Sequence, residues 1–219
     1  MKKHRGNPNV PITDPKIEKY SEDHTSPESK EILNLINSSD QELQYIDMIS
    51  GRVVGQLLKI LIKISGAQRI LEIGTFTGYS AIMMAEALPI NGEIITLEMN
   101  LRYQSLAQNH FDTSEVGNKI KMICGNAQIT INELVGEFDL VYLDGDKLSY
   151  QFYFTKILDM LKPGGLIVAD NVLWDGTVLK PEDQKAMAIA AFNKQVAEDE
   201  RVEQVLLPVR DGVNIIRKL

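Results

Sequence analysis

The chain has 219 residues, of which 44% are hydrophobic and 24% charged, and its formal net charge is −7. This length suits one domain with a substantial core, and the composition is that of a globular protein. The acidic balance and the lack of a long basic stripe argue against nucleic acid as the main partner. The sequence shows neither an apolar run of about 18 residues for a membrane span nor the apolar core of a signal peptide. We therefore expect a cytoplasmic protein without a membrane partner.

The first part of the chain is predicted to be a polar arm followed by helices. Residues 1–13 are polar and contain proline, and the basic residues 2–5 are most simply a solvated tail, with a contact to an acidic substrate as the alternative. Helical patterns run from Asp14 to about Ser38, with a second start signal at Ser26-Pro27, and from about Ser50 to Ser65. These helices, within residues 14–65, are expected to cover the sheet, the active-site mouth or a partner subunit.

A strand, a glycine turn and a helix are predicted over residues 69–85. The apolar run Arg69–Ile73 is broken by Glu72, and Gly74 and Gly78 follow it. Glycines let backbone N–H groups approach a ligand, and the following helix adds a partial positive field. The G-x-x-x-G spacing differs from the dinucleotide fingerprint, and Glu72 would repel a pyrophosphate but attract a cationic ligand. The turn therefore favours S-adenosylmethionine, the alternative being an ordinary turn with an exposed glutamate.

Strands and helices then alternate to the end of the chain. This alternation predicts a mostly parallel sheet of seven strands with helices on both faces, and a closing hairpin adds one antiparallel strand. We treat residues 1–219 as a single domain with an α/β core over 66–219. The one cysteine, Cys124, ends a strand that is predicted to be buried, and it is expected to be a core thiol rather than a nucleophile. After the first strand, further strands are predicted at 93–98, 119–124, 138–143, 166–169, 202–207 and 213–217, and helices from about 101, through 131–134, over 150–161 and after Pro181.

Three acidic residues stand at predicted strand ends, where open parallel sheets bind ligands. Glu98 can accept hydrogen bonds from both hydroxyls of a ribose, the alternative being a surface glutamate. Asp144, Asp170 and Asn171 would converge if their strands are neighbours. Such oxygen donors suit a hard divalent cation, Mg²⁺ first and then Mn²⁺ or Ca²⁺, and disfavour zinc. The alternative is that the two aspartates only cap the helices that follow them.

Lys147 and Trp174 lie near the same predicted edge of the sheet. Lys147 follows Asp144 by three residues, and a lysine beside a bound cation is a candidate general base, the alternative being an exposed lysine. Trp174, the only tryptophan, could line an aromatic-substrate site or simply pack on its loop.

Several motifs in the same order resemble the cation-dependent O-methyltransferases related to caffeoyl-CoA O-methyltransferase and, more distantly, to catechol O-methyltransferase. They are LEIGTFTGYS, VYLDGDK, KPGGLIVADNVLWDG and LLPVRDGVNIIRKL, and the similarity runs from about Ile17 to Leu219. The resemblance implies a Rossmann-like S-adenosylmethionine-dependent methyltransferase fold with extra N-terminal helices. It also implies a set of roles: Ser50, Glu72, Gly74, Thr75, Ser80, Glu98, Ala127 and Asp146 at the cofactor; Asp144, Asp170 and Asn171 at the metal; Lys147 as the base; and Asp144, Trp174 and Asp175 near the acceptor.

The implied activity is methyl transfer to a phenolic hydroxyl of a catechol-like small aromatic molecule, carried out by a homodimer. Two alternatives are a metal-independent small-molecule methyltransferase and a non-catalytic S-adenosylmethionine-binding protein. The chain departs from the family pattern after Met48-Ile49-Ser50 and at Ser149, where the family often has asparagine. These departures leave the identity of the acceptor open.

Overall fold

The computed structural model describes residues 12–43 and 48–219. Most of the predicted arm, including the basic residues 2–5, lies outside the described residues. The chain forms two compact units. The first unit contains the described residues up to Asp23 together with Gly136–Leu219, and the second contains His24–Val135. The prediction of a single domain over 1–219 stays a prediction.

The N-terminal helical region consists of separate helices, α1 (Pro15–Asp23), α2 (Lys30–Glu42) and α3 (Gly51–Ser65). The continuous stretch predicted from Asp14 to Ser38 is interrupted, and α2 starts after Ser29 rather than after Ser26. The Ser29 hydroxyl accepts a hydrogen bond from the Ile32 N–H at 3.2 Å, which satisfies a donor that the helix start leaves open.

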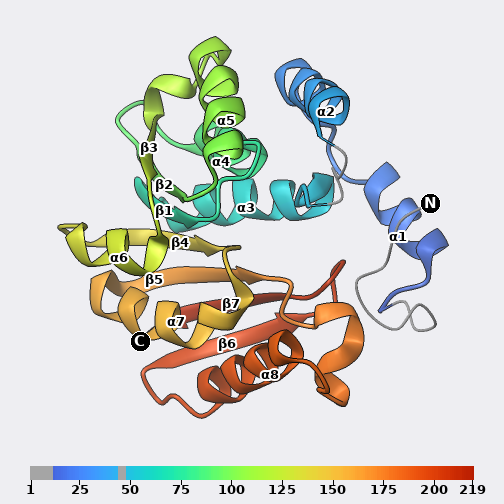
Figure 1. The fold of residues 1–219 in the computed structure, drawn as a ribbon, viewed down its shortest axis with the longest axis vertical. Coiled ribbons are helices and arrows are strands. Elements are labelled where there is room, and N and C mark those ends of the chain that lie inside the picture. The colour runs from blue at the N-terminus through green and yellow to red at the C-terminus, as the bar shows by residue number, and fades with distance from the viewer. Residues whose placement is uncertain (1–11, 44–47) are drawn as a thin grey trace. The chain divides into compact units, whose positions relative to one another are not determined.

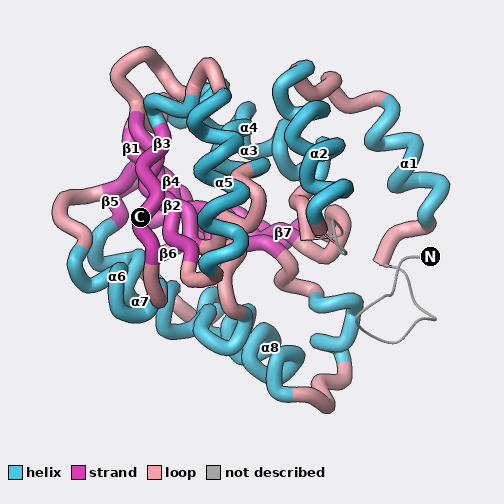
Figure 2. The backbone as a smooth tube through the Cα atoms, turned by 45° about the horizontal axis from the view of Figure 1, so that its top comes forward, coloured by secondary structure: helices cyan, strands magenta, loops and turns pink. Residues whose placement is uncertain are grey.

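The second unit carries the first three strands of the sheet. Its elements after α3 are β1 (Arg69–Ile73), α4 (Tyr79–Ala87), β2 (Glu93–Glu98), α5 (Leu101–Thr113), β3 (Ile120–Cys124) and the short α6 (Ala127–Thr130). The strands β1, β2 and β3 pair in parallel, and the predicted bounds of β1 and β2 are confirmed. In Figures 1 and 2, α3, α4 and α5 lie to one side of these strands. Because α4 is almost entirely buried, it forms much of the core of this unit.

The expectation of a buried thiol at Cys124 is wrong, since this residue is exposed. β3 stands at the edge of the sheet, and most of its residues are only partly covered. An edge strand has a neighbour on one side only, so its last residue can face solvent although its sequence is apolar.

The first unit carries the other four strands. Its elements are β4 (Phe138–Leu143), α7 (Tyr150–Met160), β5 (Leu161–Asp170), α8 (Gln184–Ala197), β6 (Val202–Leu207) and β7 (Val213–Lys218), with 3₁₀ segments at η3 (Lys147–Ser149) and η4 (Trp174–Leu179). β4 and β5 pair in parallel, whereas β7 runs antiparallel to both β5 and β6. Helices α7 and α8 pack against each other (Figure 1). β5 begins earlier than predicted, at Leu161, and its pairing with β4 shifts register between Phe138 and Leu140.

The seven strands follow the order β3-β2-β1-β4-β5-β7-β6. β7 is the one strand that opposes the direction of the others, as the closing hairpin predicts. Along the described ranges 12–43 and 48–219, no helix is both long and apolar enough to cross a membrane.

Candidate active site

The glycine turn after β1 has a backbone that only small residues tolerate well. Gly74 has φ 101° and Gly78 has φ 84°, in the left-handed region that favours glycine. A Cβ atom at Gly78 would lie 2.5 Å from the ring of Phe111, so a side chain there would collide with α5. The Gly74 N–H donates to the Leu97 carbonyl at 3.1 Å, which ties the start of the turn to β2.

Glu72 lies in β1 directly beneath this turn and is completely buried. Its two carboxylate oxygens accept hydrogen bonds from the hydroxyls of Ser80 on α4 and Thr96 on β2. The Thr96 hydroxyl also meets that of Thr75, so a chain of hydroxyl groups runs beside the carboxylate. A buried carboxylate is costly unless donors such as these satisfy it.

Glu98 ends β2 and is largely buried. One of its carboxylate oxygens accepts from the Phe76 N–H in the glycine turn at 2.9 Å, and the other accepts from the Asn100 N–H at 2.8 Å. Each oxygen keeps a further lone pair that a ligand hydroxyl can use. The structure therefore brings Glu98 to the glycine turn. Of the other predicted cofactor residues in this unit, Ser50 is buried at the start of α3 and Ala127 is half-buried at the start of α6.

In the first unit, the ends of β4 and β5 bring two aspartates together. Leu143 pairs with Ala169 in the parallel register, so Asp144 and Asp170 follow at matching positions. Asp170 is nearly fully buried, and its carboxylate accepts from the Tyr142 hydroxyl at 2.7 Å and from the Asn171 N–H at 2.7 Å. Asn171 itself is half-buried with φ 57°, in the left-handed region. The predicted convergence of these strand ends is therefore observed.

The charge at this edge is compatible with a divalent cation. Burial raises the pKa of Asp144 to about 6; Lys147 lowers it, and the neighbouring Asp170 raises it further. Repulsion between two carboxylates is what a bound cation would relieve, and two carboxylates with one amide form the oxygen donor set that Mg²⁺ prefers. Among the residues that the structure describes, no three His, Cys, Asp or Glu side chains converge as a metal cluster. The candidate set thus depends on Asn171 and on oxygens from outside the protein.

Lys147 is held at the same edge by two hydrogen bonds. It lies in η3, is nearly buried, and its Nζ contacts Asp144 Oδ1 at 2.6 Å and the Tyr150 hydroxyl at 2.7 Å. Its ammonium also lies 4.9 Å from the centre of the Tyr150 ring. Burial, reinforced by the charge of Asp144, raises the pKa of Tyr150 well above its ordinary value, so this phenol stays neutral. The alternative of an exposed lysine is excluded.

The loop after Asn171 is anchored to the turn between β6 and β7. The N–H groups of Val172 and Leu173 donate to the carbonyls of Gly212 and Asp211, and the Asp175 N–H donates to the Asp211 carboxylate at 2.5 Å. Burial raises the pKa of Asp211 to about 7, although the Asp175 N–H opposes this shift.

The two predicted acceptor residues in this loop have local partners. Trp174 is largely buried, and Lys185 Nζ lies 5.8 Å from the centre of its ring. Asp175 is half-buried with φ 54°. Asp146, predicted at the cofactor, is exposed and accepts from the Ser149 hydroxyl at 2.8 Å and from the Leu148 N–H, so it caps η3. These contacts leave the proposed ligand roles of the three residues as predictions.

Three residues at this edge are not among the site residues predicted from the sequence: Tyr142, Tyr150 and Asp211. Tyr150 follows Lys147 by three residues at a helix start, a spacing that places side chains on the same side. That spacing could have indicated from the sequence that Tyr150 lies beside Lys147. Tyr142 and Asp211 act through neighbours on other strands or loops, and no local pattern marks such contacts.

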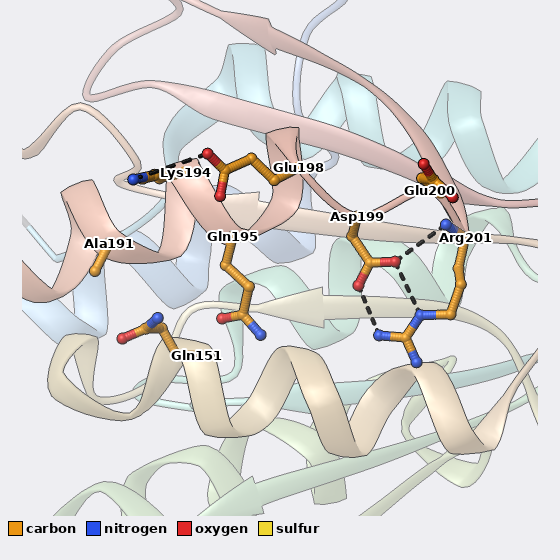
Figure 3. Close-up of a pocket in the computed structure, with 8 residues that line it drawn as sticks. All are labelled: Gln151, Ala191, Lys194, Gln195, Glu198, Asp199, Glu200 and Arg201. Atoms are coloured by element: carbon orange, nitrogen blue, oxygen red, sulfur yellow. Dashed lines mark hydrogen bonds and ion pairs between the residues drawn. The ribbon is translucent and has the colours of Figure 1, made fainter.

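A separate hollow of about 720 Å³ lies between α7 and α8 and contains none of the predicted site residues. Figure 3 shows its polar lining, with Gln151 on one helix facing Gln195 on the other. Two ion pairs stand at its rim, Asp199 with Arg201 and Lys194 with Glu198. The hollow is therefore not part of the candidate active site.

Solved structures share the fold over almost the whole chain. A methyltransferase of Podospora anserina bound to SAH superposes with a TM-score of 0.87 at 29% identity, covering 94% of each chain. An O-methyltransferase of Bacillus cereus in complex with SAH superposes with a TM-score of 0.86 at 26% identity, covering 93% of this chain and 97% of the other. The fold is thus the Rossmann-like fold of the S-adenosylmethionine-dependent methyltransferases, and the chain is an enzyme of this class.

The sequence comparisons give the family. A family model described as O-methyltransferase matches residues 22–219. Caffeoyl-CoA O-methyltransferase 2 of Zea mays is 37% identical over 179 residues, which cover 75% of this chain and 68% of the relative. The chain belongs to the O-methyltransferase family, and the resemblance noted in its motifs is confirmed.

Proposed function

We propose that this enzyme transfers the methyl group of S-adenosylmethionine to a phenolic oxygen of a vicinal dihydroxy aromatic molecule, with the help of a divalent cation. The observation that carries the proposal is the arrangement at the ends of β4 and β5. Two aspartates stand there at matching positions, and the buried amine of Lys147 lies 2.6 Å from one of them. The carboxylate pair can bind a cation, and the lysine beside it can act as a base.

The donor half of the proposal is supported by the glycine turn. Glu72 brings a buried negative charge to the turn, where a cationic ligand would be attracted, and Glu98 has lone pairs left for ribose hydroxyls. The related structures of known proteins that contain SAH support the same reading. We assign the methionine part of the donor to Ser50, Glu72, Gly74, Thr75, Ser80 and Asp146, the ribose to Glu98, and the adenine to Ala127.

The acceptor half of the proposal uses the other set of residues. Asp144, Asp170 and Asn171 would hold the cation, with Mg²⁺ the first choice. When bound there, the cation supplies positive charge that lowers the pKa of an acceptor phenol. Lys147 takes the proton from that phenol, whose oxygen then attacks the methyl group in line while the donor sulfur leaves as a neutral thioether.

The nature of the acceptor rests on the relatives and on the loop after Asn171. Relatives named for caffeoyl-CoA act on an aromatic acyl group, and Trp174 offers an aromatic surface beside Asp175. We further propose a cytoplasmic homodimer. The exposed apolar side chains Ile60 and Ile64 on α3 support a partner surface for a second copy.

The test is a methylation assay over vicinal dihydroxy aromatics, free and CoA-linked, with and without a chelator. We expect Mg²⁺-stimulated turnover that chelation removes and that Asp144→Ala reduces at least about 1,000-fold. Asp139→Asn is the control, because Asp139 lies in β4, the strand that Asp144 follows, and pairs with Lys162 instead. Full activity after chelation would favour the metal-independent methyltransferase. Donor binding without turnover on any acceptor would favour the non-catalytic binding protein.

A further inference from the structure

Tyr150 occupies a position that the proposed reaction does not by itself explain. Its side chain is completely buried, yet its hydroxyl lies 2.7 Å from Lys147 Nζ, 2.9 Å from the Asp170 carbonyl oxygen and 3.1 Å from the Leu143 carbonyl oxygen. The two carbonyl groups belong to the ends of β5 and β4, next to or within the predicted cation ligands. One hydroxyl thus connects the lysine to both strand ends.

The direction of these hydrogen bonds follows from donor and acceptor chemistry. A carbonyl oxygen can only accept, so the single proton of the Tyr150 hydroxyl points to Leu143 or Asp170. The lone pairs of the same oxygen are then left for an N–H of Lys147.

Lys147 Nζ has three directions for a proton or a lone pair besides its bond to carbon. Two of them meet acceptors, Asp144 Oδ1 at 2.6 Å and the Tyr150 oxygen at 2.7 Å. The third direction is left for the acceptor whose proton the proposed base takes. We propose that Tyr150 is a positioning residue that orients the Lys147 amine as a base, an inference that rests on the function proposed above.

The packing around Tyr150 makes its hydroxyl separable from its ring. The ring meets Phe192 of α8 edge-on, with ring centres 5.3 Å apart, and Phe192 also packs edge-on against Phe154. Tyr150→Phe keeps these aromatic contacts and removes one oxygen. Tyr153→Phe is the matched control, because Tyr153 is a buried tyrosine of the same helix whose hydroxyl bonds to Ser149.

The experiment measures kcat, acceptor KM and Mg²⁺ affinity of both variants. We expect Tyr150→Phe to lower kcat about tenfold, with KM and the Mg²⁺ dissociation constant within twofold of the parent, because one hydrogen bond to the amine is lost. Tyr153→Phe should leave all three quantities within twofold. An unchanged kcat in Tyr150→Phe would overturn the inference, and so would a fall in kcat matched by loss of Mg²⁺ affinity.

A measurement without turnover covers the case in which Tyr150→Phe is too unstable for kinetics. Acetylation of Lys147 by an activated ester, followed by peptide mass spectrometry, should be several-fold slower in Tyr150→Phe than in Tyr153→Phe, because the reactive direction of the amine is no longer fixed. Equal rates would contradict the positioning role. Lys147→Met separates the two proposals: full activity in that variant defeats the proposed base, whereas an inactive Lys147→Met with a fully active Tyr150→Phe defeats only the inference on Tyr150.

Discussion

Glu72 and Asp144 are carboxylates at the ends of parallel strands, but their surroundings differ in kind. Glu72 is enclosed and accepts hydrogen bonds from the neutral hydroxyls of Ser80 and Thr96. Asp144 faces the amine of Lys147 and a second carboxylate, and its pKa is raised to about 6. The hydroxyl groups hold the Glu72 carboxyl group in one position at the glycine turn. At the ends of β4 and β5, by contrast, two carboxylates and an amine lie together, and a bound cation would change the net charge of this group.

Among the variants that test this difference between Glu72 and Asp144, Glu72→Gln is expected to have the largest effect. The amide keeps the shape of the side chain but removes the charge, and one of its two polar atoms becomes a donor facing a hydroxyl. Hydrogen bonds to charged groups contribute about 1.5–3 kcal/mol, so we expect SAH to bind about 10- to 100-fold more weakly. Calorimetric titration measures this change, while the Mg²⁺ dissociation constant should stay within twofold.

Glu93→Gln is the control for that variant, because Glu93 is an exposed residue of β2 that pairs with Arg69. It should leave SAH affinity unchanged. Equal weakening of Mg²⁺ and SAH binding in Glu72→Gln would show that the charge of Glu72 does not act on the donor alone.

A smaller effect is expected from Tyr142→Phe, which changes the proposed cation site at the ends of β4 and β5. The Tyr142 hydroxyl is buried and donates to one oxygen of Asp170, which fixes the carboxylate. Removal of groups that orient metal ligands typically costs 10- to 100-fold in metal affinity, and we expect about tenfold here. Mg²⁺-induced thermal stabilisation, followed over a concentration series, gives the constant. SAH affinity should not change, and unaltered Mg²⁺ binding would refute the assignment of Asp170.

The smallest effect concerns the stability of the charged edge. Because the pKa of Asp211 is raised from 3.8 to about 7, the folded protein retains a proton that the unfolded chain releases between about pH 4 and pH 7. The free energy of unfolding therefore falls across this range as pH rises, and the full penalty is present above pH 7. Asp211→Asn stays neutral and keeps an acceptor for the Asp175 N–H. We expect it to gain about 1 kcal/mol relative to the parent between pH 5 and pH 8, by urea unfolding.

Asp199→Asn is the control, because the pKa of Asp199 is shifted in the opposite direction from that of Asp211. The Arg201 guanidinium lowers the pKa of Asp199, so the stabilisation by this pair is complete above the ordinary pKa of an aspartate. The variant should lose the same stability at pH 5 and at pH 8. A pH-dependent difference of the Asp211→Asn type in this variant would mean that the titration being observed is not local to Asp211.

Much of the sheet could be predicted from the sequence because its strands are short, apolar and bounded by turn residues. The runs ending at Ile73, Glu98, Leu143 and Leu207 are strands with the predicted ends. Cys124 shows the limit of this reasoning. Apolar composition indicates a strand, but whether that strand is central or at an edge depends on the order of pairing, which only the tertiary fold determines.

The residues of the candidate site also differ in whether local sequence patterns could predict them. The acids at strand ends could be found because parallel strands present their carboxyl ends at one edge. Tyr142 could not, because it lies within the apolar run of β4 and reaches Asp170 across the pairing of two strands. Asp211 stands 36 residues from its partner Asp175, and nothing in the local sequence links them.

The loop from Asn171 to Gly176 has one more consequence. Asn171, Trp174, Asp175 and Gly176 all adopt left-handed backbone conformations, three of them with side chains that disfavour it. Such residues each cost of order 1–3 kcal/mol and persist only where the surroundings hold them. Here the holding groups are in the turn before β7. The final hairpin is therefore a brace for the loop, and a shortened C-terminus would be expected to disturb the enzyme at Asn171, more than 40 residues earlier in the chain.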